Sequence, residues 1–255
     1  MFYFYTAVWF IVGLAVGSFA NVVIYRFPRG ISLVKTRSCC PSCKNRLVAR
    51  ELIPLLGYLL CRGRCRHCRA RISPRYFLIE LATGLLFVAV VHRTGANPEA
   101  LGLLFLLCLL LIISFIDIDF QRIPNVLLGI GLAAGIIFKL LDPAGRTLPS
   151  WIEAGWGMLL GGGIMLLIYI GARGAIGAGD LKLMIMIGFF VGKIGVLAAM
   201  MMGFILGGAY GLVMIALRRL DRKDMIPFGP FLSLGAAIQV FFGEQILQWL
   251  GLNYF

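Results

Sequence analysis

Long apolar stretches fill most of the chain and constrain its fold more than any other feature. A helix needs about 20 apolar residues to cross a bilayer. Eight stretches approach or reach that length: residues 2–25, 76–92, 100–116, 126–141, 151–170, 181–192, 194–217 and 227–250. Hydrophobic residues make up 60% of the 255 residues and charged residues 14%, against about 45–50% and about 25% in soluble proteins. The sequence therefore predicts an integral membrane protein and excludes a soluble or disordered chain.

Helices are the expected secondary structure of these stretches. No stretch alternates apolar and polar residues as the strands of a membrane barrel do, and helices satisfy their own backbone hydrogen bonds in lipid. The predicted fold class is an all-α polytopic membrane protein of about eight transmembrane helices. No internal repeat is evident. We expect a first transmembrane helix over residues 1–25, an insert over residues 26–75 and a seven-helix membrane bundle over residues 76–255.

Positive charge is concentrated in the insert. Residues 26–75 hold 13 of the 24 Lys and Arg residues and a single acid, Glu51. Basic residues collect in cytoplasmic loops, so the insert is predicted to be cytoplasmic. Eight spans then place residues 117–125, 171–182 and 218–226 on the same side, together with 20 of the 24 basic residues. A basic surface also suits nucleic acid, but membrane topology and anionic lipid explain this charge, and no nucleic-acid partner is expected.

Two C-x2-C pairs in the insert predict a metal site. Cys40 and Cys43 form one pair, and Cys65 and Cys68 form the other after 21 intervening residues. Two such turns brought together offer four thiolates to a structural, tetrahedral Zn²⁺. Two dithiol pairs are the alternative, although a reducing cytoplasm disfavours structural disulfides.

Three further cysteines lie outside these pairs. Cys39 and Cys61 are close to them in sequence and are alternative metal ligands. Cys108 lies within an apolar stretch, where a cysteine usually packs as a small hydrophobic residue.

Acidic residues at the ends of the predicted spans indicate a second site. Asp117 and Asp119 end the third stretch, and Asp180 opens the sixth. Ionisable groups at membrane depth are costly and usually functional. Two carboxylates from different helices in a poorly hydrated site cannot both ionise easily, so one holds a proton while the other acts as a base. This pairing suits activation of water and protonation of a leaving amine.

Asp117 is the expected acid of the third stretch. Successive helical residues turn by about 100°, so Asp117 and Asp119 point in directions about 200° apart and cannot both face Asp180. Asp117 directly follows the apolar run and is expected to be the less hydrated of the two. Asp119 is expected to be solvated or paired with Arg122.

Three residues around Asp180 are expected to shape the site. Gly177 and Gly179 permit unusual backbone angles and allow an extended substrate segment to approach closely. Lys182 follows two residues after the acid. Simple solvation of the acids, or pairing with Lys182 or Arg122, is the alternative interpretation.

In order along the chain, these motifs resemble the type IV prepilin leader peptidases. The resemblance rests on the two cysteine pairs and on residues 17–26, 72–76, 117–125, 177–183 and 226–231. It implies an aspartic endopeptidase of the bacterial inner membrane with Asp117 and Asp180 as its catalytic acids. The implied substrates are type IV prepilins and type II secretion pseudopilins, whose basic leader is removed at the cytoplasmic face.

The resemblance also implies a second activity, N-methylation of the new N-terminal residue with S-adenosyl-L-methionine as donor. Residues 17–26 and the insert are the candidates for that site, although no glycine-rich nucleotide loop is present. Two departures affect the insert. Glu51-Leu52-Ile53-Pro54 stands where many relatives carry Asn-Ile-Pro, and the doubled Cys39-Cys40 is unusual.

Two other function classes stay open. A transporter or proton pathway also places paired acids in a helix bundle, but it does not need the cysteine insert. A zinc-bearing membrane adaptor needs the insert and tolerates loss of Asp117 and Asp180. Activity on a purified prepilin in detergent distinguishes these classes from a peptidase.

Overall fold

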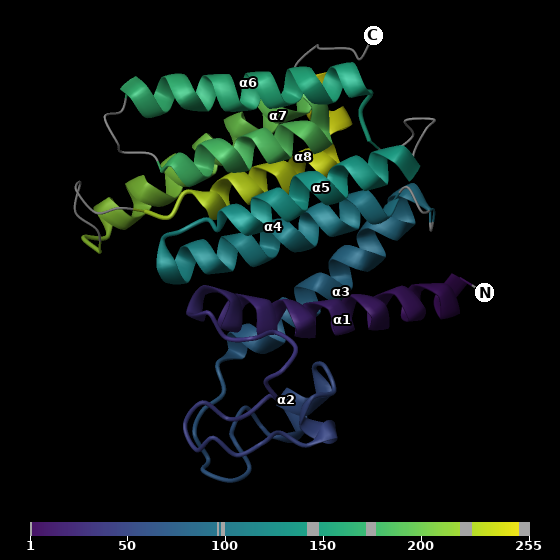
Figure 1. Ribbon diagram of the computed structural model, residues 1–255, viewed down its shortest axis with the longest axis vertical. Helices are drawn as coiled ribbons and strands as arrows, with labels where there is room; N and C mark the ends of the chain where they lie inside the picture. The colour runs from purple at the N-terminus through teal and green to yellow at the C-terminus, as the bar shows by residue number, and fades with distance from the viewer. Residues whose placement is uncertain are drawn as a thin grey trace. The chain divides into compact units, whose positions relative to one another are not determined.

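The computed structural model describes residues 2–95, 97, 100–141, 148–171, 177–219 and 226–249. Most of these residues form helices (Figure 1). The only β-type pairing among them is two isolated bridges in the insert. Five of the helices are long and apolar enough to cross a membrane. The prediction of an all-α polytopic membrane protein is confirmed. The chain divides into two compact units, Met1–Ala96 and Asn97–Phe255.

The first unit pairs two long helices and carries the insert between them. The long helices are α1 (Phe2–Arg26) and α3 (Pro74–Thr94). Short helices interrupt the insert: η1 (Phe27–Arg29), η2 (Ala49–Glu51) and α2 (Leu56–Leu60).

Small residues allow α1 and α3 to pack closely. A Cβ at Gly17 would lie 2.8 Å from the Cα of Glu80, so only glycine permits this approach of the two backbones. Asn21 Nδ2 donates a hydrogen bond to the carbonyl of Tyr76 at 3.0 Å. Glu80 Oε2 accepts the N–H of Leu55 at 2.8 Å, which attaches the insert to α3.

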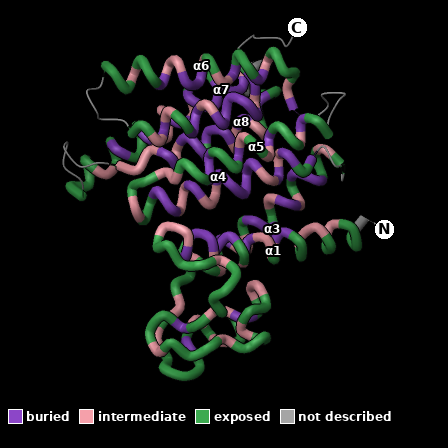
Figure 2. Tube along the Cα trace, viewed as in Figure 1, coloured by how far each residue is buried: buried purple, intermediate pink, exposed green. Residues whose placement is uncertain are grey.

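The second unit is a helix bundle. It consists of α4 (Ala100–Phe120), α5 (Asn125–Leu141), α6 (Trp151–Gly171), α7 (Ala178–Ala216) and α8 (Gly229–Trp249). Helix α7 contacts α5, α6 and α8. Buried residues concentrate along α7 and the facing sides of its neighbours, whereas α6 shows an exposed outer side (Figure 2).

Helix α7 consists of two arms that fold back on each other at Gly192. Gly192 has φ 73° and ψ −175°, a backbone conformation that glycine adopts at little cost. Gly161 of α6 lies against both Met184 and Val196, which are on opposite sides of the break. Gly157, one turn earlier, lies against both Gly188 and Gly192. The arms are therefore antiparallel, and the stretches 181–192 and 194–217 are separate helical segments, as predicted.

Contacts among the described helix ends define two ends of the second unit. At one end, Gly229 lies against Asp117, and Gly207 of the second α7 arm lies against Phe228. At the other end, Lys193 Nζ and Glu153 Oε1 form an ion pair of 3.0 Å. The segments 117–125, 177–182 and 226–229 thus share one end, as alternating spans require.

Candidate active site and metal centre

Asp117 is the buried acid of α4. Its side chain is 5% exposed, whereas Asp119 is exposed. The two residues lie about 200° apart around the helix, so only one of them faces the interior of the bundle. The expectation that Asp117 is the less hydrated acid is confirmed.

Asp180 is buried at the beginning of α7 and is 7% exposed. Its Oδ2 accepts a hydrogen bond from the backbone N–H of Gly177 at 3.2 Å. Its Oδ1 is buried and has no hydrogen-bond partner among the described residues. The amide dipoles of a helix N-terminus stabilise negative charge at this position. The bond from Gly177 holds Oδ2 in place, whereas Oδ1 remains available for proton transfer.

Gly229 is a site residue that the sequence argument did not single out. It is the first residue of α8, and its N–H donates to Oδ2 of Asp117 at 3.0 Å. A Cβ at this position would lie 2.8 Å from that same oxygen. Each acid is therefore held by a glycine N–H at the start of a helix. The segment 226–231 contributes to the family resemblance, but nothing local in its sequence indicates which acid it contacts.

Ile123 connects the surroundings of the two acids. A Cβ at Gly179 would lie 3.0 Å from the Cβ of Ile123, and a Cβ at Gly229 would lie 3.2 Å from its Cδ1. Asp117 also acts electrostatically on Asp180. The start of α7, the end of α4 and the start of α8 therefore meet at one site.

One expectation about the glycines is wrong. Gly177 has φ −74° and ψ 143°, which any residue adopts, and Gly179 also lacks a positive φ. What the positions require is space, because a Cβ at Gly177 would lie 3.2 Å from Asp180 Oδ2 and one at Gly179 would press on Ile123. The small size of these glycines therefore serves contacts within the protein, and the close approach of a substrate segment stays a prediction.

Lys182 does not neutralise the acids. Its Nζ donates to Oδ1 of Asn125 at 2.9 Å. This bond connects the first turns of α7 and α5, and Asn125 directly follows the Ile123-Pro124 segment. Because both carboxyls are buried, their simultaneous ionisation is unfavourable, which favours a state in which one acid is protonated and the other is ionised. Such a pair can act as a base toward water and as an acid toward a leaving group.

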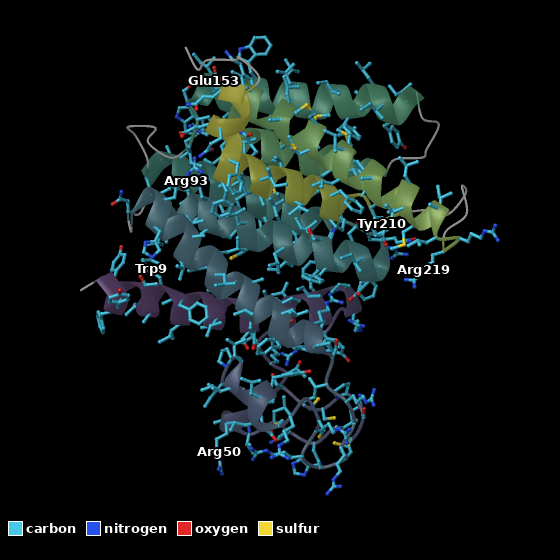
Figure 3. All side chains as sticks on the ribbon, turned by 180° about the vertical axis from the view of Figure 1, so that it is seen from behind. Trp9, Arg50, Arg93, Glu153, Tyr210 and Arg219 are labelled. Carbon is cyan, nitrogen blue, oxygen red and sulfur yellow. The ribbon has the colours of Figure 1, made fainter. Side chains whose placement is uncertain are left out.

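The insert brings four cysteine sulfurs together. The Sγ atoms of Cys40, Cys43, Cys65 and Cys68 all lie within 4.8 Å of one another (sulfur atoms in Figure 3). The pairs Cys40–Cys68 and Cys43–Cys65 are 3.8 and 3.9 Å apart. A tetrahedral metal with bonds of about 2.3 Å to sulfur separates its ligands by about 3.8 Å. This four-cysteine cluster therefore fits a metal ion, and Cys39 and Cys61 are outside it.

The two cysteine turns are structural copies of each other, displaced by 25 residues. The N–H of Cys40 donates to the carbonyl of Asn45 at 2.9 Å, and the N–H of Cys65 donates to that of Ala70 at the same distance. The bridge between Cys39 and Arg46 is repeated between Arg64 and Arg71. The two C-x2-C pairs of the insert therefore share one backbone geometry, although most of the side chains around them differ.

Backbone groups favour the thiolate of Cys40, whereas the pKa of the Cys43 thiol is raised to about 11, because the N–H of Asn45, which lowers it, is outweighed by burial and the neighbouring cysteines. The N–H groups of Cys43 and Ser42 donate to the sulfur of Cys40 and lower the pKa of its thiol to about 6, against the opposing effect of burial. Thiolates, not thiols, are the metal-binding form of cysteine.

The fold and these two sites define a multi-pass helical membrane protein with paired buried acids and a four-cysteine insert. Residues 11–94 match the bacterial peptidase A24 N-terminal domain, and residues 104–212 match the type IV leader peptidase family. No solved structure matches the chain significantly.

Several curated proteins named prepilin leader peptidase/N-methyltransferase are similar to the chain over most of its length. The one from Bacillus subtilis (strain 168) is 33% identical over 240 residues, which cover 94% of this chain and 95% of that protein. The one from Aeromonas hydrophila is 32% identical over 279 residues, which cover 98% of this chain and 95% of that protein. The one from Myxococcus xanthus is 39% identical over 81% of this chain and 62% of that protein. The chain belongs to the type IV leader peptidase family.

Proposed function

We propose that the chain is a membrane aspartic endopeptidase with Asp117 and Asp180 as its catalytic acids. Its substrates are type IV prepilins and type II secretion pseudopilins, from which it removes the basic leader peptide. The observation that carries this proposal is the meeting of two buried acids from different helices, each held by a glycine N–H. The names of the relatives support the same activity.

The arrangement of the acids suits peptide hydrolysis. One carboxylate takes a proton from water, and the resulting hydroxide attacks the scissile carbonyl carbon while the protonated acid stabilises its oxygen. The proton then passes to the leaving amine, which completes cleavage. The missing side chains of Gly177 and Gly179 let the Asp180 carboxylate and Ile123 pack against the start of α7, and Lys182 Nζ connects α7 to α5 through Asn125.

The amine released by cleavage is the substrate of the second proposed activity. N-methylation of this amine uses S-adenosyl-L-methionine, and residues 17–26 and the insert are the candidates for that site. The domain division that we propose from the sequence has three parts: the first transmembrane helix (1–25), the cytoplasmic insert (26–75) and the peptidase bundle (76–255). The protein lies in the bacterial inner membrane with both sites toward the cytoplasm. The insert carries net +12, so lipid headgroups or the acids near the site are better suited to hold a basic leader.

Cleavage of a purified prepilin by the purified protein in detergent is the direct test. We expect a shortened pilin whose new N-terminus becomes methylated when S-adenosyl-L-methionine is added. A protein that is folded, active in neither assay and equally inactive on pseudopilins would favour a transporter or an adaptor instead.

We further propose that the four-cysteine cluster holds a structural Zn²⁺. The purified protein should contain about one zinc, and replacement of Cys40 and Cys65 by Ser should remove it, because a hydroxyl binds zinc far more weakly than a thiolate. Structural zinc contributes folding energy directly, so limited proteolysis should then cut the insert first. Metal analysis and a digestion time course measure both effects.

Two cysteines provide the matched control for the zinc prediction. Replacing Cys39 and Cys61 by Ser removes two thiols from the same insert but none from the cluster, and should leave the zinc content unchanged. Wild-type protein prepared without chelator and found free of zinc would contradict the prediction.

Substitution of Gly229 by Ala should slow cleavage. The added Cβ would meet Asp117 Oδ2 at 2.8 Å, which forces the carboxylate away from the N–H that holds it. Hydrogen bonds to charged groups contribute about 1.5–3 kcal/mol, so we expect kcat to fall about tenfold to a hundredfold. Gly208→Ala is the matched control, because a Cβ there has open space around it. An unchanged kcat in Gly229→Ala would show that the contact does not position Asp117.

A further inference from the structure

A cavity in the first unit is lined by three arginines. It is an open pocket of about 430 Å³ where the end of α1, the loop that follows and the first cysteine turn meet. Arg26 comes from α1, Arg37 from the loop and Arg46 from the first cysteine turn. Phe19 and Val22 of α1 form part of its apolar wall. No acidic side chain of the described residues lines it.

Arg26 brings a buried positive charge to this cavity. The residue is 8% exposed. Its Nη1 donates to the carbonyl oxygens of Ser32, Leu33 and Thr36, at 3.4, 3.2 and 2.7 Å respectively. These acceptors are all neutral and fix the position of the guanidinium without balancing its charge. A buried charge without a counter-charge is unfavourable, so an anion in the cavity would stabilise this arrangement.

Neither the insert nor the part of α3 that packs on α1 supplies that anion, because Glu80 Oε2 already accepts the N–H of Leu55 at 2.8 Å and does not line the cavity. Residues 26–50 contain no Asp or Glu, and Glu51 is the only acid of the insert. Glu51 Oε2 accepts the N–H of Val48 at 2.9 Å, and its Oε1 faces Arg66 at 3.7 Å. Its carboxylate is therefore engaged elsewhere.

We propose that the cavity binds the phosphate of an anionic membrane phospholipid. Guanidinium groups bind phosphate oxygens through paired, charge-assisted hydrogen bonds. Arg26 is the last residue of the apolar helix α1, and Phe19 and Val22 lie one to two turns back along it. A headgroup phosphate at the arginines thus places the acyl chains along the apolar surface of α1. Basic pockets beside transmembrane helices bind anionic headgroups in this way.

Two other ligands are less suited to the cavity. A free phosphate would use the arginines but leave the apolar wall without a contact. S-adenosyl-L-methionine carries one carboxylate but two cationic groups, an ammonium and a sulfonium, which three guanidinium groups would repel. Its proposed site among residues 17–26 and the insert is therefore expected outside this cavity.

Lipid titration of the full-length protein in a neutral detergent tests the proposal. Phosphatidylglycerol should raise the thermal unfolding midpoint with saturation and appear as bound lipid in native mass spectrometry, whereas phosphatidylcholine should do neither. Replacing Arg37 and Arg46 by Gln should weaken binding of phosphatidylglycerol about tenfold or more, since two charge-assisted contacts are lost. Arg26 is left unchanged because its bonds to the loop support the fold.

The chain offers a matched control for this variant. Arg71 corresponds to Arg46 in the second cysteine turn, and Arg50 projects from the insert (Figure 3). Neither residue lines the cavity. Replacing Arg50 and Arg71 by Gln removes the same net charge and should leave binding of phosphatidylglycerol unchanged.

Four outcomes would overturn the proposal. The first is unchanged binding in the Arg37 and Arg46 variant, and the second is equal loss in both variants, which indicates bulk attraction to the insert. The third is an equal effect of phosphatidylcholine. The fourth is that inorganic phosphate, glycerol phosphate or S-adenosyl-L-methionine reproduces the stabilisation and displaces the lipid, which assigns the cavity to a soluble ligand.

Discussion

Replacing Asp180 by Asn is expected to abolish leader cleavage while the protein still inserts and folds. The amide is nearly isosteric, and its oxygen can still accept the N–H of Gly177 that Asp180 Oδ2 accepts at 3.2 Å. It cannot act as a base or share a proton, and general acid–base catalysis contributes about a hundredfold to ten-thousandfold to a rate. The conversion of purified prepilin to mature pilin measures the effect.

Two controls distinguish lost chemistry from lost structure. Methyl transfer to an already cleaved pilin does not require the paired acids, so Asp180→Asn should retain it. Glu153→Gln makes the same acid-to-amide change at the opposite end of the bundle, where Glu153 pairs with Lys193, and should cleave prepilin normally. Normal cleavage by a well-expressed Asp180→Asn protein would refute the assignment. Loss of both activities in a folded protein would indicate one shared site.

The second large effect separates the two acids of α4. Asp117→Ala should abolish cleavage, because Asp117 is buried and accepts the N–H of Gly229. Asp119→Ala should retain a substantial part of the rate, because Asp119 is exposed on the other side of the helix. Asp117→Asn keeps an acceptor for the Gly229 N–H and should be equally inactive, which removes misfolding as the explanation.

Initial rates of cleavage at matched membrane abundance measure both substitutions. An inactive Asp119→Ala together with an active Asp117→Ala would reverse the assignment. The last turn of α4 would then have to be rotated relative to the bundle.

Three features were predictable because each depends on a local pattern. They are the buried acid of α4, the four-cysteine cluster and the apolar helices. Helical periodicity alone separates Asp117 from Asp119. The spacing of Cys40 and Cys43 closes one tight turn, and its repetition at Cys65 and Cys68 suffices for a four-sulfur site. Apolar runs near the thickness of a bilayer indicate helices whatever their neighbours are.

Contacts between distant residues were not predictable. The Gly229 N–H reaches Asp117 across 112 residues of chain, and no local signal relates the two. The roles of Gly177 and Gly179 were only partly foreseen, because the sequence shows a glycine but does not show whether its backbone angles or its small size matters. The sequence shows the repeated C-x2-C spacing, but the matching backbone bonds around each cysteine turn are visible only in the structure.

The sequence by itself determined the class of the protein, its apolar helices, the four sulfurs and the two buried acids, although the described residues contain five helices long and apolar enough to cross a membrane, against the eight predicted spans. Only the tertiary structure decided how α7 folds back at Gly192, which backbone groups hold the acids, and that three arginines surround one cavity. The physical reason is the range of the forces involved. Hydrophobicity and helical periodicity act through neighbouring residues, whereas hydrogen bonds and charges in a folded bundle act between whichever groups packing brings together.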